Sequence, residues 1–75
     1  MTERQQQALS FVRRFWEENE HSPSYRDVAD ALNTHPSNAH RIIRDLLKDG
    51  FLYVPPGRAR SIYPLEIWQS LRGKS

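Results

Sequence analysis

The segment from residue 36 to residue 50 constrains the fold of this chain more than any other. Pro36 suits the first turn of a helix, where its missing N–H would have no intrahelical partner, and Gly50 allows the positive φ that ends one. Between them, apolar residues recur at spacings of three and four, which predicts an amphipathic helix with one buried face. These apolar residues are Ala39, Ile42, Ile43, Leu46 and Leu47. The opposite face carries Ser37, Asn38, His40, Arg41, Arg44 and Lys48.

Two capping patterns predict further helices before this segment. Thr2 is followed three residues later by Gln5, and Ser24 is followed three residues later by Asp27. In a capping box, the hydroxyl of the cap residue accepts a hydrogen bond from the backbone N–H of the residue three positions later. The side chain of that later residue accepts a hydrogen bond from the backbone N–H of the cap residue. We therefore expect one helix to begin just after Thr2 and another just after Ser24.

The apolar residues of these two helices indicate which faces they bury. The first helix is expected to run to about residue 20, and the second, of eight or nine residues, is expected to end near Asn33, which tolerates the left-handed conformation. The first helix has an apolar stripe of Ala8, Leu9, Val12, Phe15 and Trp16. The second is expected to bury Val28, Ala29 and Leu32.

After Gly50 the sequence predicts a small β-hairpin and a last short helix. Residues 51–54 and 61–63 are rich in β-prone side chains, and two prolines, a glycine and the arginines Arg58 and Arg60 lie between them. Pro64 is expected to close the second strand and open the helix.

Three aromatic residues, Phe15, Trp16 and Phe51, are expected in the core. Leu65, Trp68 and Leu71 lie along one side of the last helix, and are expected either to cover the core or to contact a second copy or a protein partner.

The order of these elements predicts the fold class. Two helices joined by a short turn, the second with a polar outer face, are a helix-turn-helix, and a basic hairpin directly afterwards makes it winged. We expect a mainly α fold with a small β-hairpin. Residues 1–64 would form the winged helix-turn-helix, and residues 65–75 a short C-terminal helix with a frayed tail.

Charge and composition exclude several functional classes. The formal charge is +2, but residues 1–34 hold four basic and six acidic groups, whereas residues 35–75 hold seven basic and three acidic ones. Cysteine is absent, which excludes disulfides and cysteine-based zinc sites, and the three histidines lack metal-ligand spacing. No nucleophile is paired with an oriented base. We therefore expect no enzyme, metal or cofactor, and, without a long apolar run, a soluble cytoplasmic protein rather than a membrane protein.

The polar face of the third helix favours double-stranded DNA as the partner. A major groove accepts one α-helix, and arginine, asparagine, serine and histidine are side chains that read base edges. The predicted base-reading residues are Ser37, Asn38, His40, Arg41 and Arg44. Arg58 and Arg60 of the hairpin suit phosphates or a narrow minor groove. The alternative is a protein-interaction module on the same fold that binds a repressor, a polymerase subunit or a replication protein.

Several stretches resemble the N-terminal DNA-binding domain of the LexA family of SOS-response repressors. They are Thr2-Glu3-Arg4-Gln5-Gln6, Ser22-Pro23-Ser24-Tyr25-Arg26-Asp27-Val28, Pro36-Ser37-Asn38-Ala39-His40, Lys48-Asp49-Gly50-Phe51-Leu52 and Arg60-Ser61-Ile62. The resemblance implies a transcriptional repressor that occludes promoters, bacterial or phage-encoded and associated with the nucleoid. It also implies operators read by dimers, with base contacts from Ser37, Asn38, His40 and Arg41. The positions that match backbone-contacting residues of the family are Arg4, Arg26 and Lys48.

This chain also departs from the family pattern. His40-Arg41 differs from the residues of well-known members, so their operator sequence does not transfer, and Asp49 stands where a basic residue commonly precedes the glycine. The family's C-terminal peptidase and dimerisation domain, with its Ser-Lys dyad, has no counterpart in these 75 residues. We therefore expect that RecA-stimulated self-cleavage is not an activity of this chain.

Overall fold

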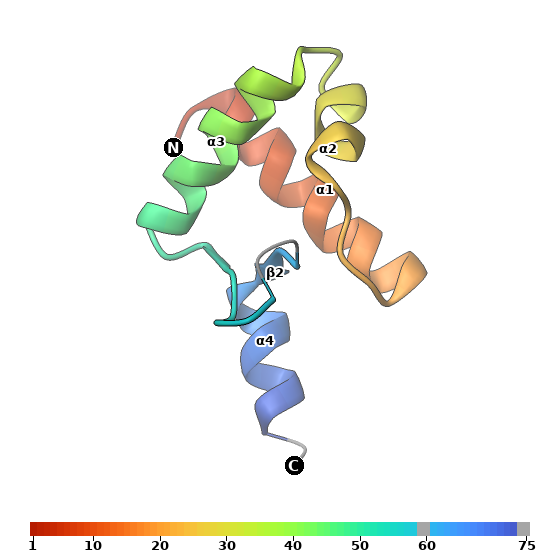
Figure 1. Ribbon diagram of the computed structural model, residues 1–75, viewed down its shortest axis with the longest axis vertical. Helices are drawn as coiled ribbons and strands as arrows, with labels where there is room; N and C mark the ends of the chain where they lie inside the picture. The colour runs from red at the N-terminus through yellow and green to blue at the C-terminus, as the bar shows by residue number, and fades with distance from the viewer. Residues whose placement is uncertain (59–60, 74–75) are drawn as a thin grey trace.

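A computed structural model describes residues 1–58 and 61–73 and has the predicted mainly helical architecture with a small hairpin (Figure 1). The elements, in chain order, are α1 (Glu3–Asn19), α2 (Tyr25–Ala31), α3 (Pro36–Lys48), β1 (Leu52–Tyr53), β2 (Tyr63–Pro64) and α4 (Leu65–Arg72). The two strands are antiparallel, with Leu52 opposite Pro64 and Tyr53 opposite Tyr63. Helices α2 and α3 with the hairpin after them make the fold a winged helix-turn-helix.

Local sequence signals set the helix ends as expected. Both capping boxes are present: the Thr2 hydroxyl accepts from the Gln5 N–H at 3.1 Å, and the Ser24 hydroxyl accepts from the Asp27 N–H at 3.0 Å. Pro36 occupies the first turn of α3. After α3, Gly50 has a φ of 84°, a left-handed conformation that a residue with a side chain adopts at a cost.

The hydrophobic core lies between the three helices and the base of the hairpin. Helices α1 and α3 contact each other, and both contact α2. The core consists of Ala8, Leu9, Val12, Val28, Ala29, Leu32, Ala39, Ile43, Leu46, Leu52, Ile62 and Tyr63, all with little or no exposed surface. The apolar residues predicted for the second helix are all buried, as are Ala39, Ile43 and Leu46 of the stripe on α3, whereas Ile42 and Leu47 are half-buried against this core.

Aromatic side chains attach the hairpin and α4 to α1. The Trp16 ring stacks on Tyr63 with centroids 4.6 Å apart, and its indole N–H donates to the Ile62 carbonyl at 2.7 Å. Trp68 of α4 lies against Tyr53 and Tyr63, with ring centroids 5.3 and 5.0 Å away. Trp68 therefore packs on its own chain, while α4 as a whole points away from the helical core (Figure 1).

The strands are shorter than the sequence predicts, and the reason lies in their backbone partners. The Ile62 N–H donates a hydrogen bond to the Ser22 hydroxyl at 2.8 Å, and the Ile62 carbonyl accepts one from the Trp16 indole N–H. Because both backbone groups of Ile62 bond outside the hairpin, β2 begins only at Tyr63. On the other strand, Pro55 follows within two residues of Tyr53 and has no N–H to extend the ladder.

Two aromatic predictions need correction. Phe51 is 39% exposed, so its assignment to the core is wrong. Its N–H donates to the Leu46 carbonyl at 3.0 Å, which makes Phe51 part of the turn that closes α3 rather than part of the strand. Phe15 is half-buried, and its ring contacts the rings of Phe11 and His21. Because Phe15 is not part of the central core cluster, its assignment to the core is also wrong.

Candidate nucleic-acid interface

Helix α3 separates its apolar and polar residues onto opposite faces. Ala39, Ile43 and Leu46 are fully buried against α1 and α2. All five residues that the sequence singles out for base reading are exposed on the other face: Ser37, Asn38, His40, Arg41 and Arg44. They span the first two and a half turns of the helix, the part that enters a major groove in helix-turn-helix proteins.

The turn between α2 and α3 is fixed by hydrogen bonds. Thr34 donates its N–H to the Ala29 carbonyl at 2.9 Å, and Asn33, with a φ of 54°, donates to Asp30 at 3.1 Å. This pair of bonds is a Schellman motif, which ends a helix through one left-handed residue. The Asn38 side-chain amide then donates to the Thr34 hydroxyl at 2.9 Å. The turn and the start of α3 therefore hold a defined relative position.

Arg4 takes part in this junction from α1. Its guanidinium donates a hydrogen bond to the carbonyl oxygen of Leu32, the residue that caps α2. An arginine has five N–H donors, so this contact leaves donors for a second acceptor. Arg4 thus joins the first helix to the turn that precedes α3.

His40 makes an aromatic contact that the sequence does not indicate. Its ring stacks on the Tyr25 ring with centroids 3.7 Å apart and an angle of 10° between the planes. Tyr25 is the first residue of α2 and is half-buried against the core. No sequence signal relates the two positions, because they are fifteen residues apart on different helices and meet only when those helices pack.

The sequence assigns two backbone-contacting arginines, Arg58 and Arg60, to the hairpin. Gly57 has a φ of 81°, and Arg58 donates its N–H to the Pro55 carbonyl at 3.1 Å, which closes the first bend. The exposed Arg58 guanidinium also donates to the Tyr63 hydroxyl at 3.1 Å. Arg60, the other predicted contact of the wing, lies outside the described residues.

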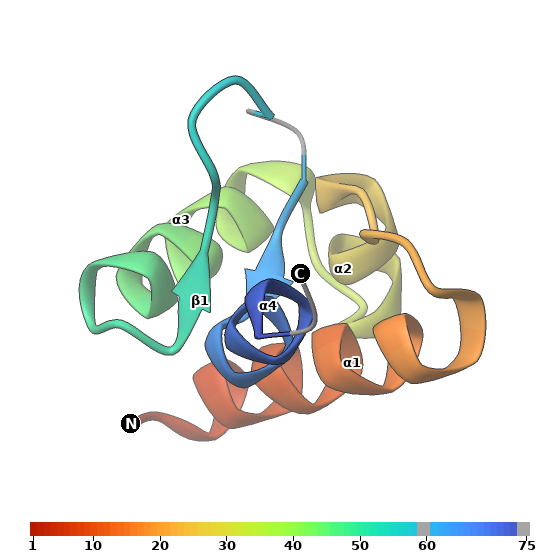
Figure 2. The ribbon, with the colours of Figure 1, turned by 90° about the horizontal axis from the view of Figure 1, so that it is seen from below.

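The other basic residues predicted to meet the DNA backbone are exposed on α2 and α3. Arg26 lies in the first turn of α2, and Lys48 is the last residue of α3. Figure 2 shows α1, in which three glutamates and three arginines balance in charge, on the side of the molecule away from the tip of the hairpin. The basic second half of the chain therefore supplies the exposed face of α3 and the wing.

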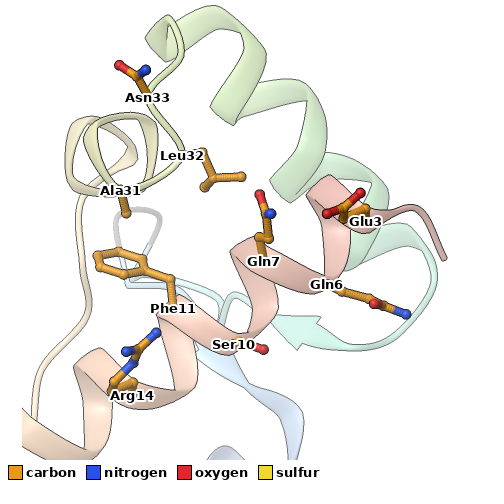
Figure 3. Close-up of a pocket in the computed structure, with 9 residues that line it drawn as sticks. All are labelled: Glu3, Gln6, Gln7, Ser10, Phe11, Arg14, Ala31, Leu32 and Asn33. Atoms are coloured by element: carbon orange, nitrogen blue, oxygen red, sulfur yellow. The ribbon is translucent and has the colours of Figure 1, made fainter.

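A surface hollow elsewhere does not include these residues. It has a volume of about 590 Å³ and lies between α1 and the end of α2 (Figure 3). Phe11 points toward Ala31 across this space, and Gln7 points toward Leu32. Its lining combines side-chain amides, the charged groups of Glu3 and Arg14, the Ser10 hydroxyl and apolar side chains. Within residues 1–58 and 61–73 there is also no group of three metal-ligating side chains, and no helix with the length and apolarity to cross a membrane.

Comparisons with known proteins assign the family. A family model described as the LexA DNA binding domain matches residues 1–61. The chain is 37% identical to a LexA repressor of Thermosipho melanesiensis over 62 residues, which cover 83% of this chain and 31% of that protein. It is 33% identical to a LexA repressor of Novosphingobium aromaticivorans over 76 residues, covering 100% of this chain and 32% of that protein. The chain thus spans about a third of the length of the relatives it matches, 31 to 32%. It belongs to the LexA DNA-binding domain family.

Proposed function

We propose that this chain binds double-stranded DNA sequence-specifically and acts as a LexA-like transcriptional repressor. The observation that carries the proposal is the exposed face of α3, where five side chains able to contact base edges stand opposite a fully buried face. A major groove about 12 Å wide admits one helix in this orientation. The family assignment supports the same partner, because the matched region is a DNA-binding domain.

Each group of residues has its own role in the proposed complex. Arg41 and Arg44 offer the planar fork that pairs with guanine, and Asn38 offers an amide suited to adenine. Ser37 and His40 contact further base edges. The backbone contacts are assigned to Arg4, Arg26, Lys48, Arg58 and Arg60. Phosphate contacts fix the register of the protein on the duplex, while the α3 contacts supply sequence preference.

Occupation of a promoter by this domain would block transcription, as part of an SOS-type response in a bacterial or phage setting.

A gel-shift assay tests DNA binding directly. With the five assigned backbone contacts, we expect binding to random duplex at low salt, with the logarithm of the association constant falling with the logarithm of salt concentration at a slope of about −4.5. Absence of any shift at low salt would contradict the proposal and would favour a protein-interaction module on this fold.

We further propose that two copies bind two half-sites, with α4 holding them together. A single domain of this size buries little DNA surface, so high affinity needs a second copy. Of the three residues in the predicted C-terminal stripe, Leu65 and Trp68 are half-buried and Leu71 is 47% exposed. Leu71 is therefore the residue of the stripe with the largest exposed fraction.

Replacing Leu71 with alanine is expected to shift the protein from dimer to monomer in sedimentation velocity, because it removes apolar surface from the proposed contact. Gln69→Ala is the matched control, since Gln69 is exposed on the same helix at a position turned about 200° away. The control is expected to sediment like the wild type. A monomeric wild type, both free and on selected DNA, would refute the dimer proposal.

A further inference from the structure

The contact between Tyr25 and His40 joins the first residue of α2 to the exposed face of α3. The rings are nearly parallel, with an angle of 10° and a centroid separation of 3.7 Å. Tyr25 is half-buried and packs against the hydrophobic core, whereas His40 is exposed. The tyrosine ring is therefore the anchored member of the pair, and the imidazole ring lies on it.

Stacking restricts the freedom of the imidazole. An exposed histidine on a helix samples several χ1 rotamers, and its χ2 distribution is broad. Both ring nitrogens make hydrogen bonds in the plane of the ring, so the orientation of that plane decides which acceptors and donors they reach. A ring held parallel to Tyr25 presents its nitrogen edge in one fixed set of directions from the surface of α3.

We propose that Tyr25 is a positioning residue for sequence recognition, which holds His40 ready to contact a base edge. This role rests on the proposed DNA binding by α3. A flexible side chain loses conformational entropy when binding fixes it in one orientation. A side chain that is already fixed in the free protein avoids this loss. Tyr25 thus contributes to sequence preference through His40 and contacts no base itself.

A purely structural stack would behave differently. If the two rings only joined α2 to α3, loss of the stack would lower the stability of the domain and weaken binding to every DNA sequence alike. A positioning role instead changes the ratio between binding to the selected operator and binding to a scrambled duplex. In a variant without the His40 imidazole, a change at Tyr25 would then no longer alter this ratio.

Four variants separate these cases. Tyr25→Phe keeps an aromatic ring for the stack, Tyr25→Leu keeps apolar contact with the core but removes the ring, and His40→Ala removes the stacked imidazole. The double variant Tyr25→Leu/His40→Ala completes a mutant cycle. Circular dichroism confirms folding of each variant before binding is compared, and Tyr25→Leu guards against the unfolding that a smaller residue would cause.

The first measurement is the NMR spectrum of the free protein. We expect the His40 ring protons to be shifted upfield in the wild type and in Tyr25→Phe, and to return to ordinary positions in Tyr25→Leu. The second measurement is fluorescence anisotropy with the operator obtained by selection and with a scrambled duplex. Tyr25→Leu is expected to lower the ratio of the two affinities about three- to tenfold, whereas Tyr25→Phe leaves it unchanged.

The mutant cycle decides the proposal. In the His40→Ala background, Tyr25→Leu is expected to have no further effect on the affinity ratio. An unchanged ratio in Tyr25→Leu, an equal fall in both backgrounds, or the absence of the upfield shift in the wild type would overturn the positioning role. If the wild type shows the stack by NMR but binds no DNA, the proposed function has failed, and the positioning role fails with it for that separate reason.

Discussion

Replacement of Ile43 with alanine is expected to lower the free energy of unfolding by about 2–5 kcal/mol. Ile43 lies on the inner face of α3, has no exposed surface and is among the largest fully buried side chains. Truncation removes apolar contacts and leaves a cavity between α3 and the helices that support it. A domain of 75 residues has a small core, so a loss of this size takes a large part of a stability that is about 5–15 kcal/mol in typical proteins.

Urea denaturation followed by circular dichroism measures this loss. The slope of the unfolding free energy against urea concentration should be the same in the variant and in the wild type. Ile42→Ala is the matched control, because Ile42 is the neighbouring isoleucine on the same helix and is only half-buried. We expect a clearly smaller loss in the control. Equal losses in the two variants would contradict the orientation of α3 and, with it, the assignment of its exposed face to DNA.

Replacement of Arg41 with alanine is expected to weaken binding to the selected operator by about 1–3 kcal/mol, or about 5- to 150-fold. Arg41 is exposed in the second turn of α3, between His40 and the half-buried Ile42. A bidentate contact from arginine to guanine discriminates against other bases by an amount of this order. We therefore expect Arg41→Ala to relax sequence preference at one position of each half-site, as measured by repeating the selection with the variant.

Arg58→Ala provides the comparison. Arg58 is an exposed arginine of the wing, and its guanidinium donates a hydrogen bond to the Tyr63 hydroxyl. As a phosphate contact, its loss is expected to weaken binding to all sequences alike and to reduce the salt slope by about one. If Arg41→Ala instead weakened binding to operator and random duplex equally, Arg41 would be a backbone contact and its base-reading role would be rejected.

Much of the fold follows from short-range signals in the sequence. The Thr2 and Ser24 capping boxes, the left-handed Asn33 and the left-handed Gly50 are all present where the sequence predicts them. Each depends on hydrogen bonds or backbone torsions within about five residues, so local chemistry suffices to predict it. The spacing of apolar residues in α2 and α3 also predicts their buried faces, because a helix of known period has a known face.

The hairpin and the aromatic residues were less predictable. The strand ends depend on Ile62, whose backbone bonds to Ser22 and Trp16 rather than to the partner strand. Phe51 has β-prone neighbours, yet the turn after α3 places its side chain at the surface. At the strand end, contacts with other elements override local propensity, as is common for short strands, whereas Phe51 is placed by the turn bond of its N–H to the Leu46 carbonyl.

The sequence by itself determined where the helices begin and end, and that α3 has an apolar face opposite a polar face with groups suited to base edges. Only the tertiary structure decided that His40 lies against another helix and that Arg4 reaches the turn before α3. The Tyr25–His40 stack and the bond from Arg4 to Leu32 connect residues fifteen and twenty-eight positions apart. Such contacts arise from the packing of one helix against another, and no periodicity or cap within a single helix encodes them.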